Sequence, residues 1–462
     1  MAQKTETQKI IKNGSLYIFG NLFNKAIAFI TVPIFTRILT TEEYGIVNTY
    51  AAWVNLMAVV VGISLGNSIR NAFLEMGDEL GKYISSIFTL ATVNFGIVSV
   101  IFIFIANNIN LPNELVWLCL IESFSNFIIN VVVMRYVMEE EAMKRTLLLV
   151  LPNFWGTILS VILISFITNG RHYGKIIATC IVTTTFGLSI IIYYFIKYRT
   201  FFNKKYWTYA LPLSIPLVFH GISCNILGTS DRSIITYYCG AAETGIYSLI
   251  YNLSMVSNVL TSSAESVWIP RMCKSLKKKD YEMFNRDVKI YIYVVLFAFC
   301  GLLTFAPELI LILGGREYMA GTGMIFPIIA SSFVMFIYGI YVNVEYYYKK
   351  TKIIAISTLI AAVINVILNL IFVPQLGATA AAYTTLVAYF MSFMLHSINA
   401  KKMDKEAVPY QILILPVNIL AIAGIIVNLT MNVRFLRWSI MILLGIIYIW
   451  FFWKKLLKNT MR

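Results

Sequence analysis

The sequence has few charged residues for its length. Only 13% of its 462 residues are Asp, Glu, Lys or Arg, about half the share of an ordinary soluble domain, whereas 59% are hydrophobic. A water-facing surface cannot be built from so few charges. The composition therefore excludes a string of soluble domains and predicts a polytopic membrane protein.

Residue patterns for metal, nucleotide and disulfide chemistry are also missing. The three histidines lie on well-separated segments, no G-x-x-x-x-G-K-[ST] loop occurs, and the six cysteines form no disulfide framework. The Gly62-Ile-Ser-Leu-Gly66 segment matches a nucleophile elbow in letters only, because it has no strand-to-helix context and no evident histidine partner. We expect no metal, no cofactor, no nucleic-acid partner and no enzymatic activity.

Long continuous apolar runs occupy most of the chain. A helix needs about 20 mostly apolar residues to cross the hydrocarbon core, and continuous rather than alternating runs exclude a closed β-barrel. We therefore predict an all-α protein with about fourteen transmembrane helices. The predicted spans are residues 16–36, 45–66, 84–106, 114–134, 146–168, 176–196, 210–229, 245–265, 288–313, 324–346, 354–373, 379–398, 410–429 and 438–453.

Positive charge is distributed unevenly between the connecting segments. If the N-terminus is cytoplasmic, 29 of the 37 Lys and Arg residues lie on inner segments, 7 on outer segments and 1 within the first span. Because Lys and Arg accumulate on the cytoplasmic side, both termini are predicted to be cytoplasmic. The basic inner loop at 266–287 is typical of a topology determinant that attracts anionic lipid.

Two similar tetrapeptides indicate internal repetition. EYGI at 43–46 opens the second span, and ETGI at 243–246 opens the eighth span, 200 residues later. Six spans separate the copies, so both run in the same direction. The spacing predicts two six-helix lobes related as parallel repeats, residues 1–200 and 201–400, followed by two additional helices in 401–462, with substrate bound between the lobes.

Two ionisable side chains lie inside apolar runs, where the bilayer penalises them by roughly 2.5–3.5 kcal/mol each on insertion scales. Lys25 is near the centre of the first span, and Glu122 is inside the fourth. They could neutralise each other. Alternatively they line a hydrated cavity, in which the cation receives an anionic substrate group and the carboxylate tunes it or carries a proton.

Further polar side chains lie on the same helix faces or on other spans. They either line a cavity or bond one helix to another. The candidate cavity residues besides Lys25 and Glu122 are Asn21, Asn126, Asn130, His220, Asp231, Arg232, Asn252, Asn365 and Asn369. Interior prolines remove a backbone hydrogen bond, so Pro33, Pro212 and Pro216 are hinge candidates, with static kinks as the alternative.

Short motifs carry a resemblance to a known family. TRIL at 36–39 precedes EYGI, Asp231-Arg232 precedes ETGI, and Leu376-Gly377-Ala378 opens the twelfth span. In these motifs, and in layout over essentially the whole chain, the sequence resembles the polysaccharide-biosynthesis flippases of the multidrug/oligosaccharidyl-lipid/polysaccharide exporter superfamily. Wzx-type flippases of O-antigen or capsule repeat units are the group that it resembles most.

The resemblance implies a V-shaped, two-lobed transporter that works by alternating access in the bacterial cytoplasmic membrane. Its cargo would be an undecaprenyl-diphosphate-linked oligosaccharide, such as a lipopolysaccharide O-antigen, capsule or exopolysaccharide repeat unit. The transporter would be a monomer among membrane lipid, working with a polysaccharide polymerase and glycosyltransferases. Family members often line a central cavity with basic residues, and the residues suited to holding the pyrophosphate here are Lys25, Arg37, Arg70, Arg232 and Arg271.

Two other functions remain as alternatives. A cation-coupled multidrug or metabolite antiporter of the same superfamily would need carboxylates at its site, and Glu122 supplies one. A membrane polysaccharide polymerase or acyltransferase normally needs a large outer loop or a catalytic His/Asp set. The sequence shows neither feature, which favours a transporter.

We expect Lys25→Ala to abolish surface glycan assembly, because the substitution removes a cation from the predicted membrane midplane. Surface polymer is measured by gel staining, and membrane abundance of the variant is followed by immunoblotting and is expected to stay at the wild-type level. Normal surface polymer in this variant would remove Lys25 from the mechanism.

Overall fold

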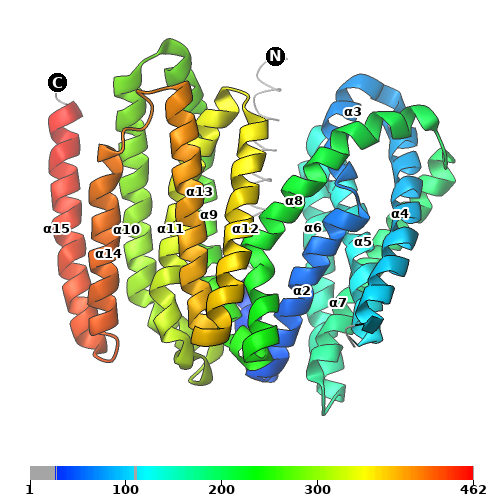
Figure 1. Ribbon diagram of the computed structural model, residues 1–462, viewed down its shortest axis with the longest axis horizontal. Coiled ribbons are helices and arrows are strands. Elements are labelled where there is room, and N and C mark those ends of the chain that lie inside the picture. The colour runs from blue at the N-terminus through cyan, green and yellow to red at the C-terminus, as the bar shows by residue number, and fades with distance from the viewer. Residues whose placement is uncertain (1–26, 28, 109–111, 461–462) are drawn as a thin grey trace. The chain divides into compact units, whose positions relative to one another are not determined.

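The computed structural model describes residue 27, residues 29–108 and residues 112–460, apart from some side chains between 255 and 270 and those of 451–460. This part of the chain consists of helices and short connections, without a β-strand (Figure 1). The predicted all-α class is confirmed. The helices continue through most of the predicted apolar runs, as expected for segments that must satisfy their own backbone hydrogen bonds in lipid.

The chain forms two compact units, Met1–Gly245 (unit 1) and Ile246–Arg462 (unit 2). Unit 1 begins with a short apolar helix, Phe29–Ile38, and continues through α2 (Thr41–Val61), η1 (Leu65–Ser68), α3 (Ile69–Met76), η2 (Gly77–Glu79), α4 (Leu80–Asn108), α5 (Asn113–Met138), α6 (Ala142–Phe166), α7 (Arg171–Tyr198) and α8 (Lys204–Cys239). Compact units and sequence repeats need not share a boundary, so the predicted lobes at 1–200 and 201–400 stay a prediction.

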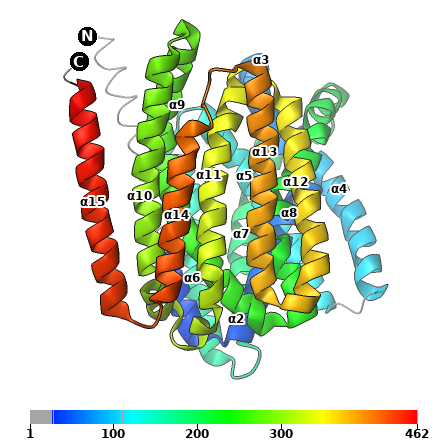
Figure 2. The same ribbon diagram turned by 60° about the vertical axis from the view of Figure 1, so that its left-hand side comes forward.

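Unit 2 begins within α9 and contains the remaining helices. They are α9 (Ala241–Lys278), α10 (Tyr281–Gly314), η3 (Glu317–Met324), α11 (Ile325–Tyr347), α12 (Thr351–Leu376), α13 (Ala378–Met403), α14 (Gln411–Leu429) and α15 (Arg434–Thr460). Within this unit α11 and α12 both pack on α13, and α10 packs on α14 (Figure 2).

Eleven helices in the described part of the chain are long and apolar enough to cross a membrane. The predicted spans without a counterpart among them are 16–36, 245–265 and 438–453, and each includes residues or side chains that are not described. Helices α9 and α15 cover two of these three spans. The protein is therefore a multi-pass membrane protein, and its helices are consistent with about fourteen spans.

Helix α5 lies at the centre of unit 1, where it packs against α2, α4, α6 and α7 (Figure 1). Edge-to-face aromatic pairs fill part of this core. The ring of Phe88 lies 6.4 Å from that of Phe127 and 5.4 Å from that of Tyr194, centroid to centroid. Such pairs contribute about 0.5–1.5 kcal/mol each beyond the burial of their surface, which fixes α4, α5 and α7 against one another.

Polar side chains close both ends of α2. Thr40 and Glu43 form a capping box, in which each side chain accepts a hydrogen bond from the backbone N–H of the other at 3.1 Å. At the other end, the Asn94 amide donates to the carbonyl oxygens of Val60 and Val61 at 3.0 and 2.8 Å. These bonds satisfy helix-end groups that would otherwise face an apolar surrounding.

The two repeated tetrapeptides contact each other through their glycines. A Cβ atom added to Gly45 would lie 1.8 Å from the carbonyl oxygen of Ala241, and one added to Gly245 would lie 2.0 Å from the carbonyl oxygen of Thr41. Only glycine permits so close an approach of two helix backbones. The repeat seen in the sequence therefore has a packing role at the first turns of α2 and α9.

Gly45→Ala is expected to lower the free energy of unfolding by about 1–3 kcal/mol or more, because the new methyl group overlaps a backbone atom. The midpoint of thermal unfolding in detergent, followed by tryptophan fluorescence, measures the change. Gly301→Ala is the matched control, since a Cβ at this position in α10 meets nothing within 4 Å and alanine favours a helix. Equal stability of the two variants would contradict the close crossing.

Candidate functional site

Glu122 is the centre of a buried polar group in unit 1. Its carboxylate, on α5, accepts a hydrogen bond from the Tyr50 hydroxyl of α2 at 2.8 Å, and Glu122 is only 8% exposed. The neighbouring Ser123 hydroxyl lies 3.1 Å from the carbonyl oxygen of Val54 and donates to it, again joining α5 to α2. Among the described residues, the side chains that hydrogen-bond this carboxylate are the neutral hydroxyl groups of Tyr50 and of Thr179 on α7.

The stripe that Glu122 begins on α5 continues towards the surface of unit 1. Asn126, one turn further, is half-buried, and Asn130, two turns further, is exposed. The predicted shared face is thus present, but it leads out of the packed interior instead of staying within it. These two asparagines could contact a solute, whereas Glu122 is covered by α2.

The predicted cationic lining is only partly visible. Lys25 and Asn21 lie outside the described residues, so their roles stay predictions. The side chains of Arg37, Arg70 and Arg271 are exposed in the structure. Their role in binding an anion stays a prediction.

The polar residues of α8 fall into two groups. His220 and Cys224 are one turn apart, with 3.7 Å between Nε2 and Sγ. Within the described part of the chain, no three His, Cys, Asp or Glu side chains are grouped as a metal ion would need. Asp231 and Arg232 are buried at 1% and 8% exposure, and Arg232 Nη1 lies 3.5 Å from the carbonyl oxygen of Gly228.

The hinge candidates lie in helices that continue past them. Pro212 and Pro216 are both exposed within α8, and Pro33 is half-buried within the first described helix. Each proline leaves one backbone carbonyl without its helical donor, which softens the helix there. Their role in motion stays a prediction.

Two of the three asparagine candidates of unit 2, Asn365 and Asn369, bond one helix to another. Asn369 Nδ2 donates to Asn365 Oδ1 at 3.2 Å within α12, Thr384 of α13 donates to Asn369 at 2.5 Å, and Asn365 donates to Thr385 at 3.3 Å. Both asparagines are 0% exposed. Asn252, on α9, is also buried, at 5% exposure. The alternative of helix-to-helix bonding thus describes the contacts of Asn365 and Asn369.

A buried acid–base pair in unit 2 was missed in the sequence. Glu345 Oε2 of α11 lies 2.7 Å from His396 Nδ1 of α13, and both side chains are 0% exposed. Tyr338 stacks on the imidazole, with 5.5 Å between ring centroids. The other carboxylate oxygen and the other ring nitrogen have no hydrogen-bond partner within the residues that the structure describes. Glu345 is an ionisable residue inside the predicted span 324–346, and this feature of the sequence could have identified it as a buried polar residue.

Lys175 is a second residue that sequence reasoning passed over. The predicted span began at 176, but α7 begins at Arg171, so Lys175 lies within the helix. Its ammonium nitrogen is 3.7 Å from the ring centroid of Phe35 and 5.9 Å from that of Tyr44. An ammonium group on an aromatic face is partly compensated by the ring quadrupole.

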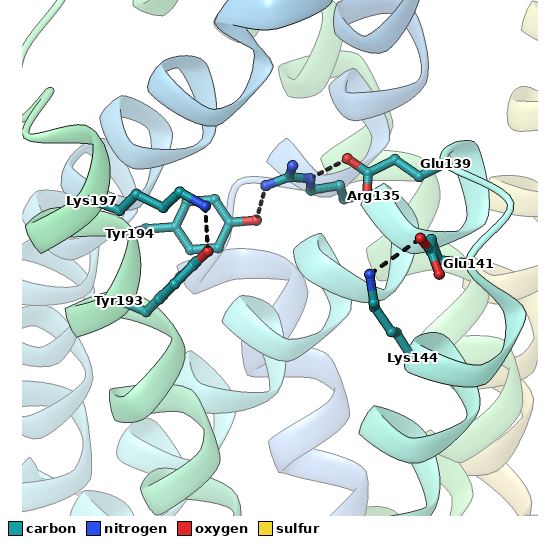
Figure 3. Close-up of polar contacts among 7 residues, drawn as sticks. All are labelled: Arg135, Glu139, Glu141, Lys144, Tyr193, Tyr194 and Lys197. Atoms are coloured by element: carbon teal, nitrogen blue, oxygen red, sulfur yellow. Dashed lines mark hydrogen bonds and ion pairs between the residues drawn. The ribbon is translucent and has the colours of Figure 1, made fainter.

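The predicted inner ends of α5 and α7 hold cations that already have partners (Figure 3). Arg135 of α5 bonds Glu139 Oε1 and the Tyr194 hydroxyl, each at 2.7 Å. Lys197 of α7 donates to the Tyr193 hydroxyl at 2.7 Å. The bond from Arg135 to Tyr194 joins the end of α5 to that of α7, whereas the other two bonds are between residues four apart in the sequence. These partnered cations distinguish this end of unit 1 from the opposite end, where Lys175 lies.

The sequence is similar to known proteins of one family. Residues 10–276 match the model of the family described as polysaccharide biosynthesis protein. The chain is 22% identical over 408 residues to Lsg locus putative protein 1 of Haemophilus influenzae, which covers 83% of this chain and 98% of that protein. It is 20% identical over 403 residues to the probable low-salt glycan biosynthesis flippase Agl15 of Haloferax volcanii, which covers 84% of this chain and 83% of that protein.

A solved structure shares the fold. The lipid II flippase MurJ in an inward closed conformation superposes with a TM-score of 0.72 at 17% identity, covering 97% of this chain and 100% of that chain. At this identity the likeness concerns the fold alone. The family match confirms the resemblance carried by the short sequence motifs.

Removing one member of the buried acid–base pair is expected to destabilise the protein strongly. His396→Leu leaves the Glu345 carboxylate buried without its partner and should cost about 3–5 kcal/mol, whereas Glu345→Met combined with His396→Leu should recover most of that loss. Chemical unfolding in detergent measures both values. His220→Leu, at a half-buried histidine without a carboxylate partner, is the control. A double variant no more stable than His396→Leu would contradict the pairing.

Proposed function

The chain belongs to the polysaccharide biosynthesis protein family, and from this premise we propose that it is a flippase for a lipid-linked oligosaccharide. The observation that carries the proposal is the family match across residues 10–276, more than half of the chain. The relative named as a glycan biosynthesis flippase and the solved structure of a lipid II flippase support the same class of cargo.

The physical need for such a protein lies in the head group of the cargo. Each sugar hydroxyl taken unsatisfied into hydrocarbon costs on the order of 2–7 kcal/mol, whereas a prenyl tail can remain in lipid throughout. Polar side chains held by apolar helices can replace the lost water. Asn126 and Asn130, which lead outward from Glu122 on α5, are side chains of this kind.

The cargo we propose is an undecaprenyl-diphosphate-linked repeat unit of O-antigen, capsule or exopolysaccharide. It moves from the inner to the outer leaflet of the bacterial cytoplasmic membrane by alternating access, in a monomer whose two termini are cytoplasmic. Glycosyltransferases build this cargo and a polysaccharide polymerase consumes it. The cations assigned to its pyrophosphate are Lys25, Arg37, Arg70, Arg232 and Arg271.

One observation favours a second candidate function, a cation-coupled antiporter for drugs or metabolites. Glu122 is a buried carboxylate that is hydrogen-bonded, among the described residues, by the neutral hydroxyl groups of Tyr50 and Thr179, so it is suited to binding a proton or an organic cation. The two candidates differ in what crosses the membrane, since an antiporter moves a soluble cation and a flippase moves a lipid head group.

Reconstitution of the full chain in proteoliposomes tests the proposal. The probe is a short-chain polyprenyl diphosphate carrying a fluorescent disaccharide, and the assay measures how much of it becomes accessible to a membrane-impermeant quencher. We expect loss of the protected inner-leaflet pool within minutes in proteoliposomes, and protection of about half of the probe in protein-free liposomes, because unaided flipping must desolvate the sugar.

Fluorescent phosphatidylcholine in the same vesicles is the control for leakage and nonspecific scrambling, and it should stay protected. The assay is repeated with a pH gradient and with an entrapped organic cation. Export of the cation without movement of the glycolipid probe would overturn the flippase in favour of the antiporter.

A further inference from the structure

Three of the seven cations on predicted outer segments gather at one end of unit 1. Arg171 Nη1, at the start of α7, bonds the carbonyl oxygen of Ile38 at 3.1 Å, which brings it next to Arg37. Lys175 lies one turn further along α7, against Phe35 of the first described helix. This gathering runs against the charge bias of the whole chain, which places few cations on the predicted outer side.

Two carboxylates, Glu42 and Glu43, lie in the first turn of α2 at this end, and Glu43 is bonded to other groups. Glu43 Oε1 accepts the backbone N–H of Arg171 at 2.6 Å and lies 4.0 Å from His172 Nδ1. Its other oxygen accepts the backbone N–H of Thr40 at 3.1 Å. Glu43 thus fastens the turn before α2 to the start of α7, while its carboxylate forms no ion pair with Lys175.

Lys175 is held in place by aromatic rings. Phe35 and Tyr44, the two rings beside its ammonium group, are each 3% exposed and therefore cannot turn away. Among the described residues the ammonium group has these aromatic contacts but neither a hydrogen bond nor an ion pair. The Lys175 side chain as a whole is half-buried, so part of it is exposed beside these rings.

Contact with two aromatic rings leaves the N–H donors of the Lys175 ammonium group without a hydrogen-bond acceptor among the described residues. A lysine carries three N–H donors, and a ring face satisfies the charge only in part. Phosphate oxygens are suited to the remaining capacity, because charge-assisted hydrogen bonds to phosphate are among the strongest that a protein forms. Lys175 lies about 6 Å along α7 from its first residue, which is near the predicted outer end of this apolar helix.

We propose that Lys175 receives the diphosphate of the lipid-linked cargo at the predicted outer end of unit 1. The inference rests on the flippase function proposed above and names a phosphate contact for it. A lipid-linked phosphate fits better than a free anion, because the prenyl tail can stay in hydrocarbon while the head group meets the ammonium. Phospholipid head groups offer the same chemistry, and the test separates the two sources.

The test uses the full chain in nanodiscs of phosphatidylcholine, with its lysines ¹³C-dimethylated and the Lys175 resonance assigned by its loss in Lys175→Gln. Farnesyl diphosphate is the probe. We expect a saturable shift of the Lys175 resonance with farnesyl diphosphate and none with farnesol. Affinity measured by radioligand binding should fall about tenfold or more in Lys175→Gln and stay within a few-fold of wild type in Lys175→Arg.

A control variant and a competing phospholipid show whether binding is specific to Lys175 and to the lipid-linked diphosphate. Arg316→Gln removes an exposed cation from a predicted outer segment of unit 2 and should bind the probe as the wild type does. Unfolding midpoints of the variants show whether each is folded, and Lys175→Arg keeps the test valid if Lys175→Gln is unstable. Unchanged affinity in folded Lys175→Gln, or an equal shift with farnesol, would overturn the proposal. A shift produced equally by phosphatidylglycerol would assign the site to membrane lipid and would overturn the assignment to cargo.

Flipping of the glycolipid probe and binding of farnesyl diphosphate are measured separately, which distinguishes an incorrect Lys175 assignment from an incorrect flippase assignment. If wild-type proteoliposomes flip the glycolipid probe and Lys175→Gln both flips it and binds farnesyl diphosphate normally, the Lys175 assignment alone is wrong. If the wild type does not flip the probe at all, the proposed function is wrong, whatever Lys175 binds.

Discussion

Polar groups inside apolar helices must find partners on other helices, because hydrocarbon offers none. In unit 1 the Tyr50 hydroxyl of α2 donates to the Glu122 carboxylate of α5. In unit 2 the amides of Asn365 and Asn369 bond with threonine hydroxyls of the neighbouring helix. Each such contact fixes the rotation of one helix against another, which apolar packing alone specifies less tightly.

The same constraint separates groups that build the protein from groups available to a ligand. Arg135 is matched by Glu139 and Tyr194, and this cation therefore contributes to joining helix ends. Lys175 rests on aromatic rings without an anion among the described residues. A membrane protein that moves a charged head group needs cations that, like Lys175, have no protein anion as a partner. A cation already paired with a carboxylate would have to break that bond before binding cargo.

Several features of the structure could be predicted from single residues and others could not. Glycines 45 and 245 were visible as parts of a repeated tetrapeptide, but their mutual contact was not, because 200 residues separate them. Asn365 and Asn369 were recognised as polar residues on one helix face, while the threonines of α13 that bond them were not. Glu345 and His396 were overlooked because each alone is an isolated residue near the end of a span.

The sequence by itself determined the helical class, the membrane location and most of the spans, because these depend on the summed hydropathy of about 20 consecutive residues. It also carried the family motifs, which are local. The partners of each buried polar group were decided only by the tertiary structure. Whether Glu122 meets a phenol or an ammonium group, and whether Lys175 meets a carboxylate or a ring, depends on which faces of distant helices come together, and no local pattern records that choice.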